Sequence, residues 1–177
     1  MIARIRRALK GSPWSREEIQ EFIAQSETDL DADEKSMLSG VLEVSETQVR
    51  DVMVPRSHMV VIDIDEEFDD ILKTIVQSGH SRFPVVGEDR DEVLGVLLAK
   101  DLLRYFGSEA ADDVPLQKLL RPVSVIPESK RLNVLLKEFR TNRNHMAIVI
   151  DEYGTAAGLV TIEDVLEQIV GEIEDEH

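Results

Sequence analysis

The sequence predicts a mixed α/β fold of the α+β kind, in which two tandem β-α-β-β-α modules pack about a pseudo-twofold axis behind a helical N-terminal segment. The main observation is an internal repeat. Gly95-Val-Leu-Leu-Ala-Lys-Asp101 recurs as Gly158-Leu-Val-Thr-Ile-Glu-Asp164, with the glycines and the aspartates each 63 residues apart. Apolar runs begin 12 residues before each glycine, at Phe83 and Met146, and a helical pattern follows each aspartate. Matched runs with the same spacing indicate that one supersecondary unit has been duplicated.

The composition is that of a folded, acidic protein. Of 177 residues, 42% are hydrophobic and 32% are charged, and the formal net charge of -16 disfavours general binding to nucleic acid. The chain contains no cysteine, which removes thiol catalysis and agrees with a reducing compartment. We find no signal peptide and no apolar run of about 18 residues. We therefore expect a cytoplasmic chain without direct membrane insertion.

Residues 1–50 are expected to form a helical N-terminal segment. Capping residues predict three short helices: from Ser15, whose capping box uses Glu18, to about Gln25; from Asp31 toward Val44; and from Ser45 to a stop before Pro55. Two interpretations stay open. The segment is either a lead-in that packs on the main domain or a partner-docking arm, helped by the basic first ten residues.

Residues 51–108 form the first predicted module. Hydrophobic periodicity predicts a strand at 60–64, a helix at 68–77, a hairpin of strands 82–86 and 93–98 around the polar loop 87–92, and a helix at 100–106. The first helix ends at Ser78-Gly79-His80. Its apolar face is expected to contain Phe68, Ile71, Leu72, Ile75 and Val76.

Residues 116–173 repeat this order. The pattern predicts a strand at 123–126, a helix at 132–140, strands at 146–150 and 157–160 around the turn 151–155, and a helix at 162–173. An acidic tail, 174–177, follows. Because a module of about 60 residues buries little surface alone, we expect the two to pack together. Such packing leaves two equivalent clefts at the interface, where ligand sites commonly lie.

Thr161 and Asp164 mark the better of these clefts. They lie where a strand meets a helix N-terminus, which offers N–H groups and a positive dipole end to a phosphate. The Thr161 hydroxyl adds a donor, and Asp164 is placed to accept from the hydroxyls of a ribose. The alternative is structural, with Thr161 as the helix cap and Asp164 as a first-turn acid. In the first module Leu98 replaces the threonine, while Asp101 is kept with Lys100 beside it, so unequal clefts are predicted.

The run His80-Ser81-Arg82-Phe83-Pro84 is the second group of candidates. Arg82 and Ser81 can bind phosphate oxygens, and Phe83 with Pro84 can supply an apolar wall or exposed backbone for a flat base. The alternative places Phe83 in the core and leaves Arg82 as a solvated charge.

No catalytic or metal site is predicted. The four histidines, His58, His80, His145 and His177, lack metal-ligand spacing, and no nucleophile elbow, Walker loop or Ser-His-Asp pattern occurs. The acidic end from Glu163 onward is expected to be a solvated helix face and tail. Weak Mg²⁺ binding through water is the alternative for it.

These motifs resemble a known family. Two modules ending in Gly-x5-Asp look like a CBS domain pair over roughly 53–170. Longer strings are similar to those of the magnesium and cobalt efflux protein CorC family: RDVMVPR at 50–56, SGHSRFPV at 78–85, IDEYGT at 150–155, GLVTIEDVLE at 158–167 and VGEIEDE at 170–176.

The resemblance implies a regulatory adenine nucleotide, AMP or ATP, with or without Mg²⁺, and a role in magnesium and cobalt homeostasis or efflux. The binding residues that it implies are Val54, Pro55, Ser81, Arg82, Phe83, Pro84, Thr161 and Asp164. It implies a second, weaker pocket at Asp101, Pro122, Val123, His145 and Met146.

The resemblance also implies partners. CBS pairs associate as homodimers, and any transport role would act through a membrane cation transporter. Many relatives continue into a C-terminal transporter-associated domain, so the chain is expected to be part of a longer protein. The residues alone leave open an interaction scaffold that binds no small molecule. A hydrolytic enzyme is not expected, because no nucleophile or general-base pattern occurs.

Overall fold

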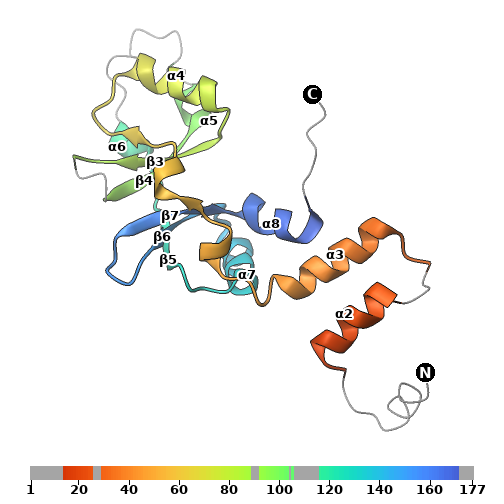
Figure 1. The fold of residues 1–177 in the computed structure, drawn as a ribbon. Coiled ribbons are helices and arrows are strands. Elements are labelled where there is room, and N and C mark those ends of the chain that lie inside the picture. Colours follow the sequence, from red (N-terminus) through yellow and green to blue (C-terminus); the bar gives the residue numbers. More distant parts are fainter. Residues whose placement is uncertain (1–13, 26–28, 89–91, 104, 106–115, 172–177) are drawn as a thin grey trace, which may run out of the picture.

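The structure is a computed structural model and describes residues 14–25, 29–88, 92–103, 105 and 116–171. Two small sheets lie one above the other with helices around them (Figure 1). The first has the order β2-β3-β4, at Ile62–Asp63, Arg82–Val86 and Val93–Leu98. The second has the order β1-β7-β6-β5, at Val54–Pro55, Ala156–Thr161, Met146–Ile150 and Ser124–Pro127. The predicted fold class is confirmed.

The helices of the first module are α4, α5 and α6, at Phe68–Ser78, Ala99–Leu102 and Leu116–Leu119. α4 ends at Gly79, whose φ of 69° is left-handed and suits glycine. Ile71 is buried, but Val76 is 79% exposed, so its predicted place on the apolar face is wrong. At 3.6 residues per turn Val76 points about 140° away from Ile71. The helix predicted at 100–106 is α5, which ends at Leu102. Phe106 lies outside the described residues.

The second module has the same pairing as the first. In each, a parallel strand pair precedes an antiparallel hairpin: β2 with β3 and β3 with β4, then β5 with β6 and β6 with β7. Its helices are α7 at Leu132–Asn142 and α8 at Ile162–Val170. The predicted extension of α8 to Ile173 falls outside the described residues.

Two predicted N-terminal helices are confirmed. They are α2 at Arg16–Gln25 and α3 at Ala32–Glu43. At the start of α2, the Glu18 N–H donates to Ser15 Oγ at 3.3 Å and the Ser15 N–H donates to Glu18 Oε2 at 2.9 Å. A second capping box, between Asp31 and Glu34, begins α3. Local side-chain chemistry therefore sets both helix starts.

The third predicted helix, from Ser45, is wrong. The chain forms a 3₁₀ turn there instead, η1 at Val49–Asp51, and a second one, η2 at Arg56–His58, follows Pro55. The N–H groups of Val49 and Arg50 donate to backbone carbonyls of the second module at 2.9 and 3.0 Å. A continuous α-helix would have to use those N–H groups internally, so tertiary pairing replaces it.

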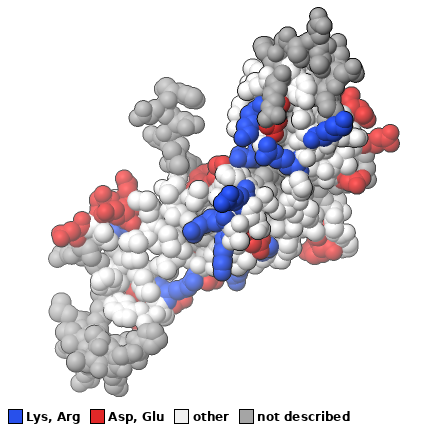
Figure 2. All heavy atoms as spheres, turned by 180° about the vertical axis from the view of Figure 1, so that it is seen from behind, with Lys and Arg blue, Asp and Glu red and all other residues white. Residues whose placement is uncertain are grey.

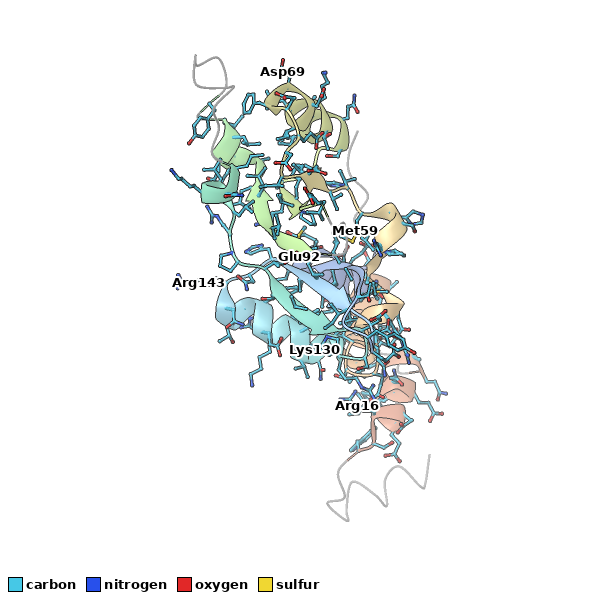
Figure 3. All side chains as sticks on the ribbon, turned by 90° about the vertical axis from the view of Figure 1, so that its left-hand side faces the viewer. Arg16, Met59, Asp69, Glu92, Lys130 and Arg143 are labelled. Atoms are coloured by element: carbon cyan, nitrogen blue, oxygen red, sulfur yellow. The ribbon has the colours of Figure 1, made fainter. Side chains whose placement is uncertain are left out.

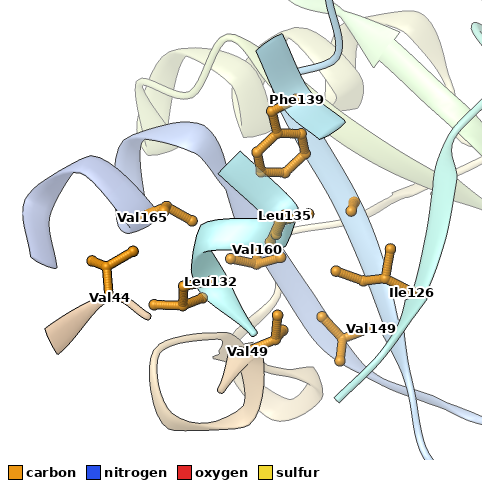
Figure 4. Close-up of a cluster of buried hydrophobic side chains, with 10 residues drawn as sticks. Val44, Val49, Ile126, Leu132, Leu135, Phe139, Val149, Val160 and Val165 are labelled. Atoms are coloured by element: carbon orange, nitrogen blue, oxygen red, sulfur yellow. The ribbon is translucent and has the colours of Figure 1, made fainter. Parts of the chain in front are cut away.

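The helix α3 packs on the second module, as the lead-in interpretation predicts, and α2 packs on α3. α3 lies against α8, and Gly40 makes the close contact, because a Cβ there would lie 2.7 Å from the Gln168 carbonyl oxygen. Val44 and Val49 join the buried cluster of the second module, in which Figure 4 shows them beside Val165 and Leu132. The segment before the first module therefore completes the core of the second.

The two modules exchange the short segments that precede them. The first leader, residues 48–55, runs beside the second module, where Val54 pairs with Leu159 of β7. The second leader, residues 120–123, runs beside the first module, where Arg121 and Val96 of β4 exchange both backbone hydrogen bonds at 2.9 Å each. Each leader therefore lies on the sheet of the other module.

A third buried cluster forms where the two sheets meet. Its members come from β4 of the first module and from β6 and β7 of the second: Val96, Leu98, Met146, Ile148, Ala156 and Leu159. Burial of apolar area of this kind fixes the modules against each other. Two of its members, Met146 and Leu159, also line the cleft between the modules that is described below.

Candidate functional site

A cleft of about 360 Å³ opens between the two modules. This inter-module cleft is lined by residues of the first leader and the segment just after it, of the α4–β3 connection and β3, and of β6, β7 and α8: Val54, His58, Met59, Val60, Gly79, His80, Ser81, Arg82, Pro84, Met146, Leu159, Thr161, Glu163 and Asp164. Figure 3 labels Met59 at the level where the modules meet. The volume lies within the range of small-molecule sites.

Thr161 and Asp164 form a reciprocal cap at the start of α8. Asp164 Oδ2 accepts from the Thr161 N–H at 2.7 Å and from the Thr161 hydroxyl at 2.8 Å, while the Asp164 N–H donates to Thr161 Oγ1 at 3.2 Å. Among the described residues, no donor reaches Asp164 Oδ1. The structural interpretation of this pair is therefore correct, and it leaves one carboxylate oxygen for another partner.

The expectation of free N–H groups at this helix start is wrong for three residues. The N–H groups of Thr161 and Asp164 are bonded within the cap, and the Ile162 N–H donates to the His145 carbonyl at 3.0 Å. The Thr161 hydroxyl hydrogen is also committed to Asp164. Thr161 therefore holds the carboxylate in position rather than presenting a donor to a phosphate.

The charged groups of the cleft are mixed in sign. Arg82 is half-buried at the start of β3, and the exposed side chains of His58, His80 and Ser81 lie nearby in the lining. Glu163 and Asp164 supply negative charge. Figure 2 shows Lys and Arg side chains gathered across the middle of one face of this acidic chain. The acidic excess is therefore unevenly distributed over the surface.

The cleft gathers most, but not all, of the residues predicted for it. Val54, Ser81, Arg82, Pro84, Thr161 and Asp164 line it. Pro55 is exposed and pairs with Gly158 without lining the cleft. Phe83 is 0% exposed and belongs to the core of the first module, so the prediction that its side chain forms an apolar wall of the cleft is wrong. Alternation along β3 explains this, because neighbouring residues of a strand point to opposite faces.

The residues predicted for the weaker pocket have other surroundings. Asp101 is buried and accepts from Arg121 Nη2 at 2.9 Å. Met146, assigned in advance to that pocket, lines the inter-module cleft instead. His145 Nδ1 lies 3.9 Å from Glu163 Oε1, in a solvent-exposed pair. Pro122 is exposed and Val123 packs on the sheet-to-sheet cluster.

Several lining residues had no signal in the sequence. Met59, Val60 and Leu159 are apolar residues of ordinary spacing, and Gly79 appeared only as a helix stop. His58 lacks metal-ligand spacing and carries no other signal, whereas His80 belongs to the predicted candidate run at 80–84. Knowledge of the leader exchange would have found His58 to Val60, because that exchange carries them across to β7.

Two absences concern the described part of the chain. No group of three or more acidic or histidine side chains there has the geometry of a metal site. No helix among the described residues combines the length and the apolarity that a bilayer span requires.

Comparison with known proteins gives a consistent result. Residues 49–108 and 113–171 each match the CBS domain family. The magnesium and cobalt efflux protein CorC of Vibrio cholerae serotype O1 is 51% identical over 175 residues, which cover 98% of this chain and 60% of that protein. The chain therefore spans about 60% of the length of this curated relative.

Solved structures agree with the fold and include nucleotide complexes. The CBS domain of a bacterial CNNM/CorC family Mg²⁺ transporter is 41% identical, with a TM-score of 0.83 over 92% of this chain and 100% of that one. The same domain in complex with ATP is 44% identical, with a TM-score of 0.75 over 79% and 99%. A CBS-domain pair with bound AMP from Klebsiella pneumoniae is 31% identical, with a TM-score of 0.62 over 71% and 99%.

Proposed function

This chain belongs to the CBS domain family, as a CBS pair of the CorC/CNNM magnesium and cobalt efflux group, and from that premise we propose that its inter-module cleft binds an adenine nucleotide as a regulatory ligand. One observation carries the proposal. No described donor reaches Asp164 Oδ1. The Asp164 side chain lines the cleft, which also contains Arg82 and an apolar wall. Acid, base and apolar surface in one cleft suit a ribose, a phosphate and a purine.

Each part of the ligand has a matching group. Asp164 Oδ1 would accept from the ribose hydroxyls, because Thr161 holds Oδ2 and so fixes the carboxylate. Arg82 and Ser81 would bind phosphate oxygens, since a guanidinium is a strong donor to phosphate. The base would lie against apolar lining residues, namely Val54, Met59, Met146 and Leu159. ATP would bring Mg²⁺ on its phosphates, whereas AMP would not.

Binding would act on the arrangement of the two modules. The cleft takes residues from both modules, so a ligand that contacts both walls favours the arrangement in which those walls are correctly spaced. A regulatory effect requires different affinities for two arrangements. We propose that a cation-transport protein on the cytoplasmic side of the membrane reads this difference.

The first test is thermal stability with nucleotide on the wild type, Asp164→Ala and Asp101→Ala. A ligand that binds only the folded state at about 100 times its Kd stabilises by about 2.7 kcal/mol, or about 5–10 °C for a chain of this size. We expect AMP or Mg·ATP to raise the Tm of the wild type and of Asp101→Ala. We expect no rise in Asp164→Ala, whose Tm without ligand also falls because the cap is lost.

Asp101→Ala is the matched control, because it makes the same change at the repeat-related position. A nucleotide shift that survives in Asp164→Ala would contradict the proposed site. No shift and no heat of binding in the wild type would favour the interaction scaffold. Phosphate release from ATP would instead indicate a hydrolase.

We also propose a homodimer, in keeping with the exposed apolar residues of the first module. Val76 on α4 is 79% exposed and Leu103 after α5 is 67% exposed. We expect light scattering to give twice the 20.0 kDa mass of one chain. Val76→Glu should give the monomer mass, because a charge in a packed interface is costly, and Val125→Glu, at a residue 55% exposed on β5, is the control. A monomeric wild type at high concentration would contradict this proposal.

A further inference from the structure

We infer that Arg121 occupies the mirror position of the nucleotide site as a tethered cation, so that each chain binds one nucleotide and not two. This inference deepens the proposed function and rests on it. It concerns the place in the first module that corresponds by repeat to Thr161 and Asp164, namely Leu98 and Asp101.

The exchanged leaders identify the residue that corresponds to Arg121. Val54 pairs with Leu159, and Arg121 pairs with Val96, and Leu159 and Val96 are repeat-related. The glycines before them give the same result: a Cβ on Gly158 would clash with the Val54 carbonyl, and a Cβ on Gly95 would lie 2.9 Å from the Arg121 carbonyl. Arg121 is therefore the counterpart of Val54.

Val54 and Arg121 differ in how they treat the neighbouring aspartate. The short apolar side chain of Val54 lines the inter-module cleft and leaves Asp164 Oδ1 without a described donor. Arg121 donates from Nη2 to Asp101 Oδ2 at 2.9 Å. Lys100, expected from the sequence to supply charge there, is exposed.

Burial makes the Asp101 pair hard to displace. The Asp101 side chain is 12% exposed, whereas that of Arg121 is 55% exposed. A nearly buried carboxylate requires a partner, and a charge-assisted bond from a guanidinium is stronger than one from a ribose hydroxyl. Two backbone hydrogen bonds to Val96 hold the Arg121 backbone in place beside β4. The Arg121 side chain is therefore anchored near Asp101. A ribose at this carboxylate would therefore have to compete with the Arg121 guanidinium, which lies against it.

The residue beside Asp101 reinforces the difference. Leu98 has no hydroxyl and belongs to the sheet-to-sheet cluster, whereas Thr161 orients Asp164 by two hydrogen bonds to Oδ2. The first module therefore lacks the group that holds a carboxylate ready for a sugar. It has instead a cation that already pairs with one oxygen, Oδ2, of the carboxylate.

Calorimetric titration with ATP and Mg²⁺ tests this inference through stoichiometry. The proteins are the wild type, Arg121→Lys, which keeps a cation, and a double variant, Arg121→Val with Leu98→Thr. The double variant places the counterparts of Val54 and Thr161 at the mirror position. We expect one nucleotide per chain for the wild type and Arg121→Lys. We expect two for the double variant, provided that its circular dichroism and Tm show a folded chain.

Two results would overturn the inference while leaving the proposed function standing. One is two nucleotides bound by the wild type, and the other is one bound by a folded double variant. No binding by the wild type would overturn the proposed function and this inference with it.

A second measurement needs no variant that alters the core. The side-chain Nε–H signal of Arg121 in a ¹⁵N-labelled wild type should stay in place at saturating ATP, while that of Arg82 should shift. A shift of Arg121 equal to that of Arg82 would overturn the inference.

Discussion

Replacing Phe83 with alanine is expected to lower the free energy of unfolding by about 3–5 kcal/mol. Phe83 is 0% exposed, and its ring belongs to the cluster that also contains Ile62, Ile71 and Leu97. Loss of the ring removes buried apolar surface and leaves a cavity that the surrounding strands cannot fill. Urea unfolding followed by circular dichroism measures the change.

Phe83→Leu is the matched control, and it should cost less than about 1.5 kcal/mol because it keeps most of the apolar volume. The experiment also separates two roles for this residue. If Phe83 were a wall of the cleft, Phe83→Ala would leave stability nearly unchanged and would weaken nucleotide binding strongly. That outcome would contradict its place in the core.

Replacing Gly158 with alanine is expected to destabilise the chain by about 3 kcal/mol, the upper part of the range for overpacking. A Cβ at Gly158 would lie closer than 3.0 Å to the Val54 carbonyl oxygen and 3.3 Å from Met53 Sδ. Both neighbours belong to the first leader, so the added methyl group pushes β1 away from β7. Because Val54 and Leu159 line the cleft, we also expect weaker nucleotide binding.

Gly87→Ala is the control for this change. A Cβ there would meet only the Leu94 side chain, at an ordinary 3.5 Å or more, so stability and binding should stay within experimental error of the wild type. Urea unfolding and calorimetry on the same samples measure both effects. Equal stabilities for Gly158→Ala and Gly87→Ala would show that β1 moves away at little cost. The close contact at Gly158 would then not hold the first leader in position.

The repeat made most of the fold predictable from the sequence. Periodicity placed both hairpins and the helices α4 and α7, because their apolar residues recur at the spacing of each element. Capping pairs placed the starts of α2 and α3, because those hydrogen bonds are local. Asp164 and Arg82 could be selected as cleft residues because Asp164 lies in the first turn of α8 and Arg82 begins β3.

Apart from Val76, which local helix geometry turns away from Ile71, the errors concern contacts between distant parts of the chain. The first leader has only two strand residues, Val54–Pro55, which is too short for any pattern, so its pairing with β7 could not be predicted. Phe83 and Met146 were misplaced because the sequence does not say which side of a strand faces the core. Arg121 attracted no attention, because its contact with Asp101 depends on the second leader.

The exchange of leaders also has a consequence for how the protein is made. Val54 and Leu159 are 105 positions apart, and chains emerge from the ribosome N-terminus first. At about 5–20 residues per second, the first leader waits about 5–20 s for the strand that pairs with it. The first module is also fully synthesised before the second leader that joins its sheet. Synthesis order and pairing order are therefore reversed at this point, and the earliest β-segment of the chain is among the last to find its partner.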